Sequence, residues 1–189
     1  MTAPHGGTLV ERVSQNAPAL HERAKTAPVV LLSAVTQSDL ELIATGVYSP
    51  LRGFMGRDAY LAVLNDMHLP DGLRWTLPIT LPVDTDTADT LQVGQDVALA
   101  DESGAIIGLL ELAEKFTYDK NTEAERVYGT TDAAHPGVAR LYAQGDVYLA
   151  GEIWLLRESS PEFPAIHRTP AQTRAIFVER GWRRVVAFQ

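Results

Sequence analysis

The chain contains no cysteine among its 189 residues. Without thiols it can form neither a disulfide nor a thiolate nucleophile, and it cannot hold a cysteine-ligated zinc or iron–sulfur site. This absence suits a reducing compartment, and we expect a cytoplasmic protein. Long apolar runs are also missing. None approaches the roughly 20 residues that a membrane-spanning helix needs, and the first residues lack an apolar signal core, so we expect no membrane partner.

Positive charge is in short supply as well. The 24 acidic residues outnumber the 16 basic ones, which gives a net charge of −8. An acidic balance disfavours a nucleic-acid-binding surface, so we expect no nucleic-acid partner, although Arg183 and Arg184 form one local basic pair. Hydrophobic residues make up 46% of the chain, which is enough for a core in one domain or one and a half.

The short motifs of catalysis and nucleotide binding are absent too. The sequence has no H-E-x-x-H pair, no G-x-S-x-G elbow, no Walker A loop and no dinucleotide fingerprint. The histidines are scattered without metal-ligand spacing, at His5, His21, His68, His135 and His167. We therefore expect no metal ligand and no catalytic residue within this chain.

What is present before residue 157 is a series of strand patterns with a few amphipathic helices. The pattern Ser38-Asp39-Leu40-Glu41 is typical of a capping box and predicts the start of a helix that ends near Gly46. The other predicted helices span about 58–67, 124–128 and 137–143. The predicted strands span 29–32, 77–83, 97–100, 105–112 and 147–156, the third and fourth forming a hairpin. This pattern predicts a β-rich α+β domain over residues 1–160, with residues 1–27 wrapped on its surface.

A linker and the opening of a second unit follow. Residues 157–169 contain prolines and serines and few periodic apolar residues. Thr169, Pro170 and Gln172 predict a capped helix start, and Gly181 predicts its end. The apolar run 185–188 then predicts a strand buried on both faces, as in an α/β layer. We expect residues 161–189 to open an α/β domain, whose ligand site would lie beyond the carboxyl end of that strand, where Gln189 stands.

Two short motifs admit both a functional and a structural interpretation. The arginine of Gly56-Arg57-Asp58 can clamp a phosphate, but the motif opens an amphipathic helix, where Asp is a favoured cap, and we favour the structural interpretation. The loop 49–55 is either a docking surface or a loop anchored in the core by Phe54 and Met55, and both interpretations stay open.

Two other candidates are interpreted structurally. His135 precedes Pro136-Gly137, which is typical of a turn before a helix rather than of a catalytic base. The acidic residues Asp84, Asp86 and Asp89 lie in a threonine-rich stretch without the spacing of a calcium-binding loop, so we expect a solvated loop.

Several segments together resemble the amino-terminal part of the ATP sulfurylase (sulfate adenylyltransferase) family. The resemblance covers nearly the whole chain and is carried by residues 38–46, 48–55, 77–83, 135–138, 181–182 and 185–189. It implies a β-rich, PUA-like N-terminal domain followed by the start of an α/β nucleotidyltransferase domain. By this resemblance Gln189 is the first residue of a Gln-x-Arg-Asn motif and would bind sulfate or an ATP phosphate. The rest of that motif and a following histidine pair are not in this chain.

The resemblance also implies an activity. Members of the family join sulfate to the α-phosphate of ATP, which gives adenosine 5′-phosphosulfate and pyrophosphate in sulfate assimilation, and Mg²⁺ accompanies the nucleotide. ATP, sulfate, the missing catalytic domain and further copies of the complete chain are the implied partners. This chain alone is expected to bind no cofactor and to be inactive. Two alternatives stay open: a stand-alone PUA-like binding module without catalysis, and one half of a split enzyme.

Overall fold

The structure, a computed structural model, describes residues 3–14, 16–158, 161 and 163–187. Its centre is a six-stranded sheet with the order β1-β4-β5-β6-β2, in which β3 also pairs with β6. The strands are β1 (Val29–Leu31), β2 (Gly53–Phe54), β3 (Leu81–Val83), β4 (Asp96–Ala100), β5 (Ile106–Thr117) and β6 (Val147–Leu155). The helices are α1 (Pro18–Thr26), α2 (Ala34–Ala44), α3 (Arg57–Asp66), α4 (Thr85–Thr90), α5 (Lys120–Tyr128), α6 (Pro136–Ala143) and α7 (Pro170–Glu179).

The long strands β5 and β6 lie at the centre of this sheet. β5 pairs antiparallel with β4 on one side and with β6 on the other. The predicted hairpin between β4 and β5 is confirmed. Asp101 closes its turn by accepting hydrogen bonds from the Ser103 and Ala105 amides at 2.9 and 3.1 Å, and Gly104 takes a positive φ of 83°.

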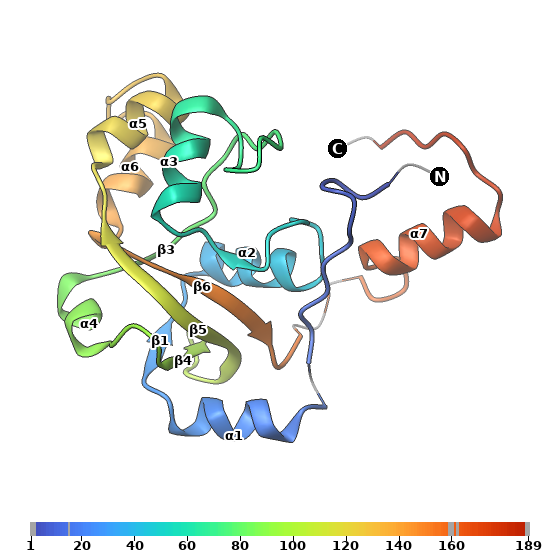
Figure 1. Cartoon of the computed structure of the whole chain (residues 1–189), viewed down its shortest axis with the longest axis horizontal. Coiled ribbons are helices and arrows are strands. Elements are labelled where there is room, and N and C mark those ends of the chain that lie inside the picture. Colours follow the sequence, from blue (N-terminus) through green and yellow to red (C-terminus); the bar gives the residue numbers. More distant parts are fainter. Residues whose placement is uncertain (1–2, 15, 159–160, 162, 188–189) are drawn as a thin grey trace.

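The main core lies between the sheet and the helices on one of its faces. Leu40, Ile43 and Ala44 of α2 are fully buried there with Leu110 and Leu149 of the sheet. On the other face α1 lies across β4 and β5 (Figure 1). The α+β fold class expected from the sequence is confirmed.

The helix predicted from Ser38 begins earlier than expected. Ser33 has the extended backbone of a cap, and its hydroxyl accepts the Thr36 amide, so α2 starts at Ala34 and Ser38 lies inside it. Two helices were missed. α1 lies in the stretch 1–27, and α4 forms in the supposed acidic loop, where Asp84 caps it by accepting the Thr87 amide at 2.6 Å.

The strand predicted over 77–83 is shorter than expected. Only Leu81–Val83 pairs with β6, and Pro78 and Pro82 cannot donate to a ladder. The strand predicted over 185–188 is wrong over its described part. Residues 185–187 are irregular and exposed because no strand of the described chain lies beside them, and Phe188 lies outside the described residues.

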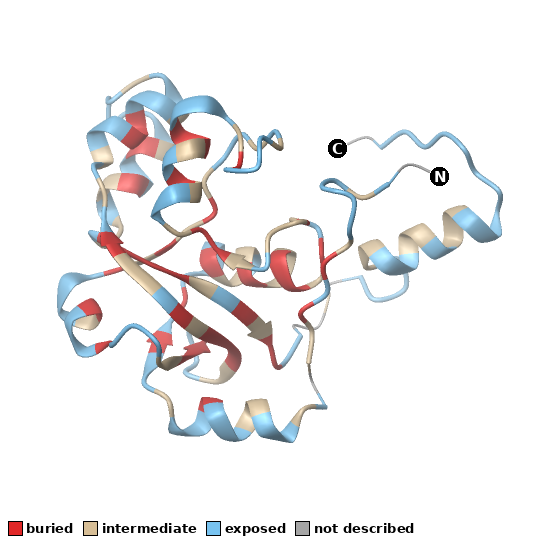
Figure 2. Cartoon of the chain, in the orientation of Figure 1, coloured by how far each residue is buried: buried red, intermediate tan, exposed pale blue. Residues whose placement is uncertain are grey.

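The segment after residue 163 stands apart from the sheet. α7 lies at one side of the molecule, beyond the end of α2 (Figure 1), and Figure 2 shows it without a buried residue. Its predicted capping box and the left-handed Gly181 (φ 65°) are confirmed. Within the described residues, no helix is long and apolar enough to cross a membrane.

Candidate functional site

The segment from Arg168 to Val185 forms a basic pocket, which we call the arginine pocket. Local contacts fix the first turn of α7: the Gln172 amide donates to Thr169 Oγ1 at 3.3 Å, and the Thr169 amide donates to Gln172 Oε1 at 3.0 Å. Gly181 then reverses the chain, so that the Trp182 ring lies 6.1 Å from the Phe177 ring. Helix and tail thereby face each other.

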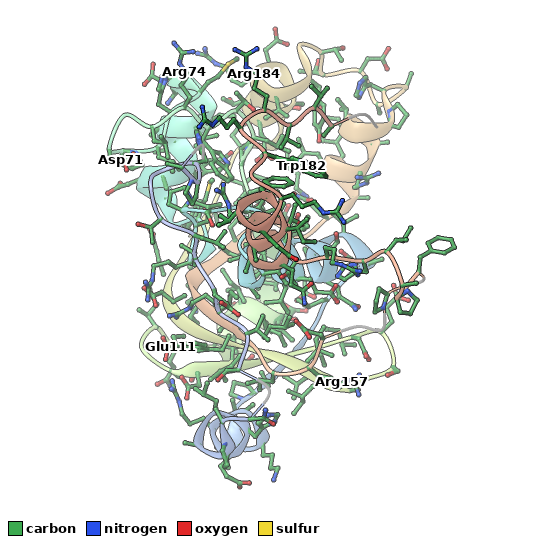
Figure 3. All side chains as sticks on the ribbon, turned by 90° about the vertical axis from the view of Figure 1, so that its right-hand side faces the viewer. Asp71, Arg74, Glu111, Arg157, Trp182 and Arg184 are labelled. Atoms are coloured by element: carbon green, nitrogen blue, oxygen red, sulfur yellow. The ribbon has the colours of Figure 1, made fainter. Side chains whose placement is uncertain are left out.

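The arginine pocket has a volume of about 630 Å³. Its wall combines the aromatic pair with four guanidinium groups, and Val47 contributes from the loop after α2. The arginines are Arg168, Arg174, Arg183 and Arg184. Figure 3 looks directly at α7 and labels Trp182 and Arg184 on the segment that follows it.

Charge makes the arginine pocket unusual for this molecule. Four of the 16 basic residues converge there in a chain whose net charge is −8. Arg168 donates to the His167 carbonyl at 2.5 Å, which orients one guanidinium without neutralising it. Arginine donors beside aromatic rings suit a phosphate or sulfate group, because the planar fork matches two oxygens of the anion.

The sequence-predicted site residue, Gln189, lies outside the described residues. The other candidates hold structural positions. His135 caps α6, where its Nδ1 accepts the Gly137 amide at 3.2 Å. Gly56-Arg57-Asp58 opens α3, as the structural interpretation predicted, although Gly56 and not Asp58 is the cap. In the 49–55 loop, Phe54 and Met55 are buried, which favours the core-anchored interpretation.

The described part of the chain does not bring metal-ligating side chains together. There, no group of three or more His, Asp and Glu side chains is placed to hold an ion. Asp84, Asp86 and Asp89 belong to the cap and body of α4, and Asp84 is engaged with its own helix.

The structure contains a buried polar cluster that the sequence analysis did not predict. Glu123 on α5 is 7% exposed, and its Oε2 accepts the hydroxyls of Tyr60 and Tyr148 at 2.9 Å each. Burial raises the pKa of Glu123, and the two hydrogen bonds oppose that rise. The Tyr118 ring stacks on the Tyr148 ring at 3.7 Å, and Gln144 donates to both tyrosine hydroxyls. Nothing local marks Glu123, because its partners come from α3 and β6.

The chain matches one protein family over most of its length. The family described as PUA-like domain covers residues 2–158. This chain belongs to the PUA-like domain family. The matched range takes in every strand of the sheet and ends before α7, so that Val47 is the one named lining residue of the arginine pocket that it includes.

Relatives of this chain carry the name that the sequence resemblance suggested. It is 54% identical over 189 residues to a sulfate adenylyltransferase of Synechococcus sp. (strain JA-3-3Ab), a match that covers 98% of this chain and 48% of the relative. It is 49% identical over 192 residues to a probable bifunctional SAT/APS kinase 2 of Sorangium cellulosum (strain So ce56), covering 100% of this chain and 33% of that one. The resemblance to sulfate adenylyltransferases is thereby confirmed.

A solved structure shows the same fold. The chain superposes with a TM-score of 0.75 and 32% identity on a structure described as hexameric APS kinase from Thiobacillus denitrificans, covering 97% of this chain and 33% of that one. The chain spans about half the length of the sulfate adenylyltransferases that it matches.

Proposed function

We propose that this chain is the N-terminal region of a cytoplasmic sulfate adenylyltransferase of sulfate assimilation. The reaction is ATP plus sulfate giving adenosine 5′-phosphosulfate and pyrophosphate. The observation that carries the proposal is the 54% identity along 98% of the chain to a relative of that name and about twice the length. In this proposal the PUA-like domain supports and orients a catalytic part that the 189 residues do not include.

The chemistry explains what the arginine pocket would contribute. A sulfate oxygen bonds to the α-phosphorus of ATP while the bond from that phosphorus to pyrophosphate breaks, so two anions must be held together as charge builds up. The guanidinium groups of Arg183 and Arg184 precede Gln189 by a few residues, and the pocket they line suits an anion. Gln189 would donate its amide to a sulfate or phosphate oxygen.

Mg²⁺ would enter with ATP in this proposal. The described residues offer it no ligand group of three or more carboxylates or imidazoles, so we derive no step through a metal on this chain. The complete protein would assemble as a homo-oligomer, which the hexameric description of the Thiobacillus denitrificans relative supports.

A pyrophosphate-release assay with ATP, Mg²⁺ and sulfate tests the proposal. The chain alone should give background turnover. A chimera that joins it to the portion of the Synechococcus relative that it does not span should turn over. Turnover by the chain alone, or a folded chimera without turnover, would contradict the proposal. Activity restored by mixing two separately purified halves would instead identify a split enzyme.

A further inference from the structure

The sheet leaves an open groove between its strands β1 and β3. Among the described residues, β1 ends the strand order on one side, and β3 pairs only with β6. A cavity of about 710 Å³ separates them, lined by residues 29–31 and 82–84 and by the turn 143–146. A neighbouring hollow of about 650 Å³ shares Leu31, Pro82 and residues 143–145 with it. We call the two together the β1–β3 groove.

In the described chain, β1 pairs along one edge, so half of its backbone hydrogen-bonding groups face β4. β1 runs parallel to β4, and the bonds from the Ala98 amide to the Pro28 carbonyl (2.9 Å) and from the Leu32 amide to the Ala100 carbonyl (2.8 Å) set the phase of the ladder. Alternate residues of a parallel strand face the partner, so Val29 and Leu31 direct their N–H and C=O groups away from β4. These two residues offer two donors and two acceptors to an incoming strand.

The opposite wall is a poor hydrogen-bonding edge. β3 consists of Leu81, Pro82 and Val83, and the proline has no N–H to donate. An extended segment in the groove therefore pairs with β1. Four exposed apolar side chains line the groove beside that edge and suit the side chains of a strand: Val29, Leu31, Val35 and Leu77.

The groove carries a carboxylate that the core holds in place. Both tyrosine hydrogen bonds to Glu123 end on Oε2, and Glu123 lines the groove. Neither tyrosine hydroxyl donates to Oε1, which leaves that oxygen to accept from an occupant. Asp39, Asp84 and Asp146 line the groove as well, against the single guanidinium of Arg140 and the Lys120 ammonium bound to Asp146 at 2.7 Å. This charge balance selects a cationic occupant.

We propose that the β1–β3 groove binds an extended, basic segment of a partner protein. The segment adds as a strand to the open edge of β1 and places a lysine or arginine side chain against Glu123 Oε1. Backbone hydrogen bonds to Val29 and Leu31 provide affinity, and the buried carboxylate provides selectivity for the basic residue. The site lies within the PUA-like domain and away from the arginine pocket, so it is independent of the proposed catalytic role.

NMR titration of the labelled chain tests this assignment. The probe is a capped heptapeptide, acetyl-Thr-Val-Lys-Val-Lys-Val-Thr-amide. It should shift the amide signals of Val29, Leu31 and Glu123. A peptide with both lysines replaced by glutamate should not bind, and neither should one N-methylated at alternate residues, because methylation removes the donors that a strand edge needs. Equal binding by either control peptide, shifts confined to other parts of the chain, or no shifts at millimolar peptide would overturn the proposal.

Two substitutions place the cation. Glu123→Gln keeps an oxygen for the two tyrosines and removes the charge, so it should raise the Kd of the lysine peptide by about tenfold or more. Glu102→Gln, in the exposed turn between β4 and β5, is the matched control and should leave binding unchanged. Equal effects of the two substitutions would contradict the role of Glu123. Preferential binding of a single-stranded RNA octamer at the same residues would also overturn the proposal, because an acidic groove repels phosphate.

Discussion

Tyr60 and Tyr148 donate their hydroxyls to a single carboxylate oxygen, Oε2 of Glu123, at 2.9 Å each. Tyr60 belongs to α3, Tyr148 to β6 and Glu123 to α5, so one buried oxygen joins two helices to the sheet. The aromatic rings pack around it, with Tyr60 and Tyr148 edge to face at 5.6 Å. Removal of the acceptor therefore affects three elements at once.

Glu123→Ala should lower the free energy of unfolding by about 2–4 kcal/mol, because it leaves two buried hydroxyls without an acceptor and opens a small cavity. Glu123→Gln should cost less than half of that, since its amide oxygen still accepts. Chemical denaturation measures both. Glu102→Ala, at an exposed turn, should change the free energy by less than about 0.5 kcal/mol and serves as the control. An equal loss in the Gln and Ala variants would show that the charge, and not the acceptor, matters.

The titration of Glu123 should contribute to the pH dependence of the free energy of unfolding. Burial raises the pKa of Glu123 in the folded chain above its value in the unfolded chain. Its stabilising contribution is therefore fully present below the ordinary glutamate value of about 4.3 and is lost as the pH rises through the folded pKa. Glu123→Gln, which does not titrate, should gain stability relative to the wild type as the pH rises from about 4 to 7. Parallel stability curves for the two proteins would contradict the shifted pKa.

Local signals explain which elements the sequence predicts well. The start of α7 depends on Thr169, Pro170 and Gln172, which lie within one turn, and Gly181 ends the helix by its own backbone preference. The hairpin is equally local, because Asp101 binds amides two and four residues further on. Each of these features can be read from a few adjacent residues.

The misses share a different origin. α1 buries a single residue, Ala24, so its apolar periodicity is too weak to predict a helix. Residues 185–187 have the composition of a strand, but pairing needs a neighbour that composition cannot supply. Glu123 was overlooked because Tyr60 lies 63 residues away in the chain, and the β1–β3 groove follows only from the strand order.

Gly53→Ala should destabilise the chain strongly. A Cβ at this position would lie 1.8 Å from the Gly151 carbonyl oxygen, so β2 would have to separate from β6. We expect a loss of about 2–4 kcal/mol. Gly94→Ala is the matched control: it meets nothing within 4 Å and has only its left-handed φ of 92° to strain, which costs about 1–2 kcal/mol. Thermal denaturation should rank the two in this order, and equal losses would contradict the close approach.

Amide exchange should divide the chain into two regions. We expect slow exchange in β4, β5 and β6, which are paired and buried at the centre of the sheet. Residues 183–187 should exchange rapidly, because they are exposed and lie in no ladder. Hydrogen exchange followed by mass spectrometry resolves both regions. Slow exchange at 183–187 would show that this segment has paired with another strand.

Gln189→Ala tests whether the tail leads into a substrate site. We make the substitution in the chimera with the remainder of the Synechococcus relative. It should lower kcat/KM for sulfate by an amount equivalent to about 1–3 kcal/mol, the cost of a deleted hydrogen bond to a charged group. The melting temperature should stay nearly unchanged, since a side chain that faces a ligand contributes little to the core. Gln92→Ala, at an exposed position, is the control and should alter neither quantity. A large drop in melting temperature with normal sulfate kinetics would make Gln189 a structural residue, because the lost contacts would then lie within the protein and not with the substrate.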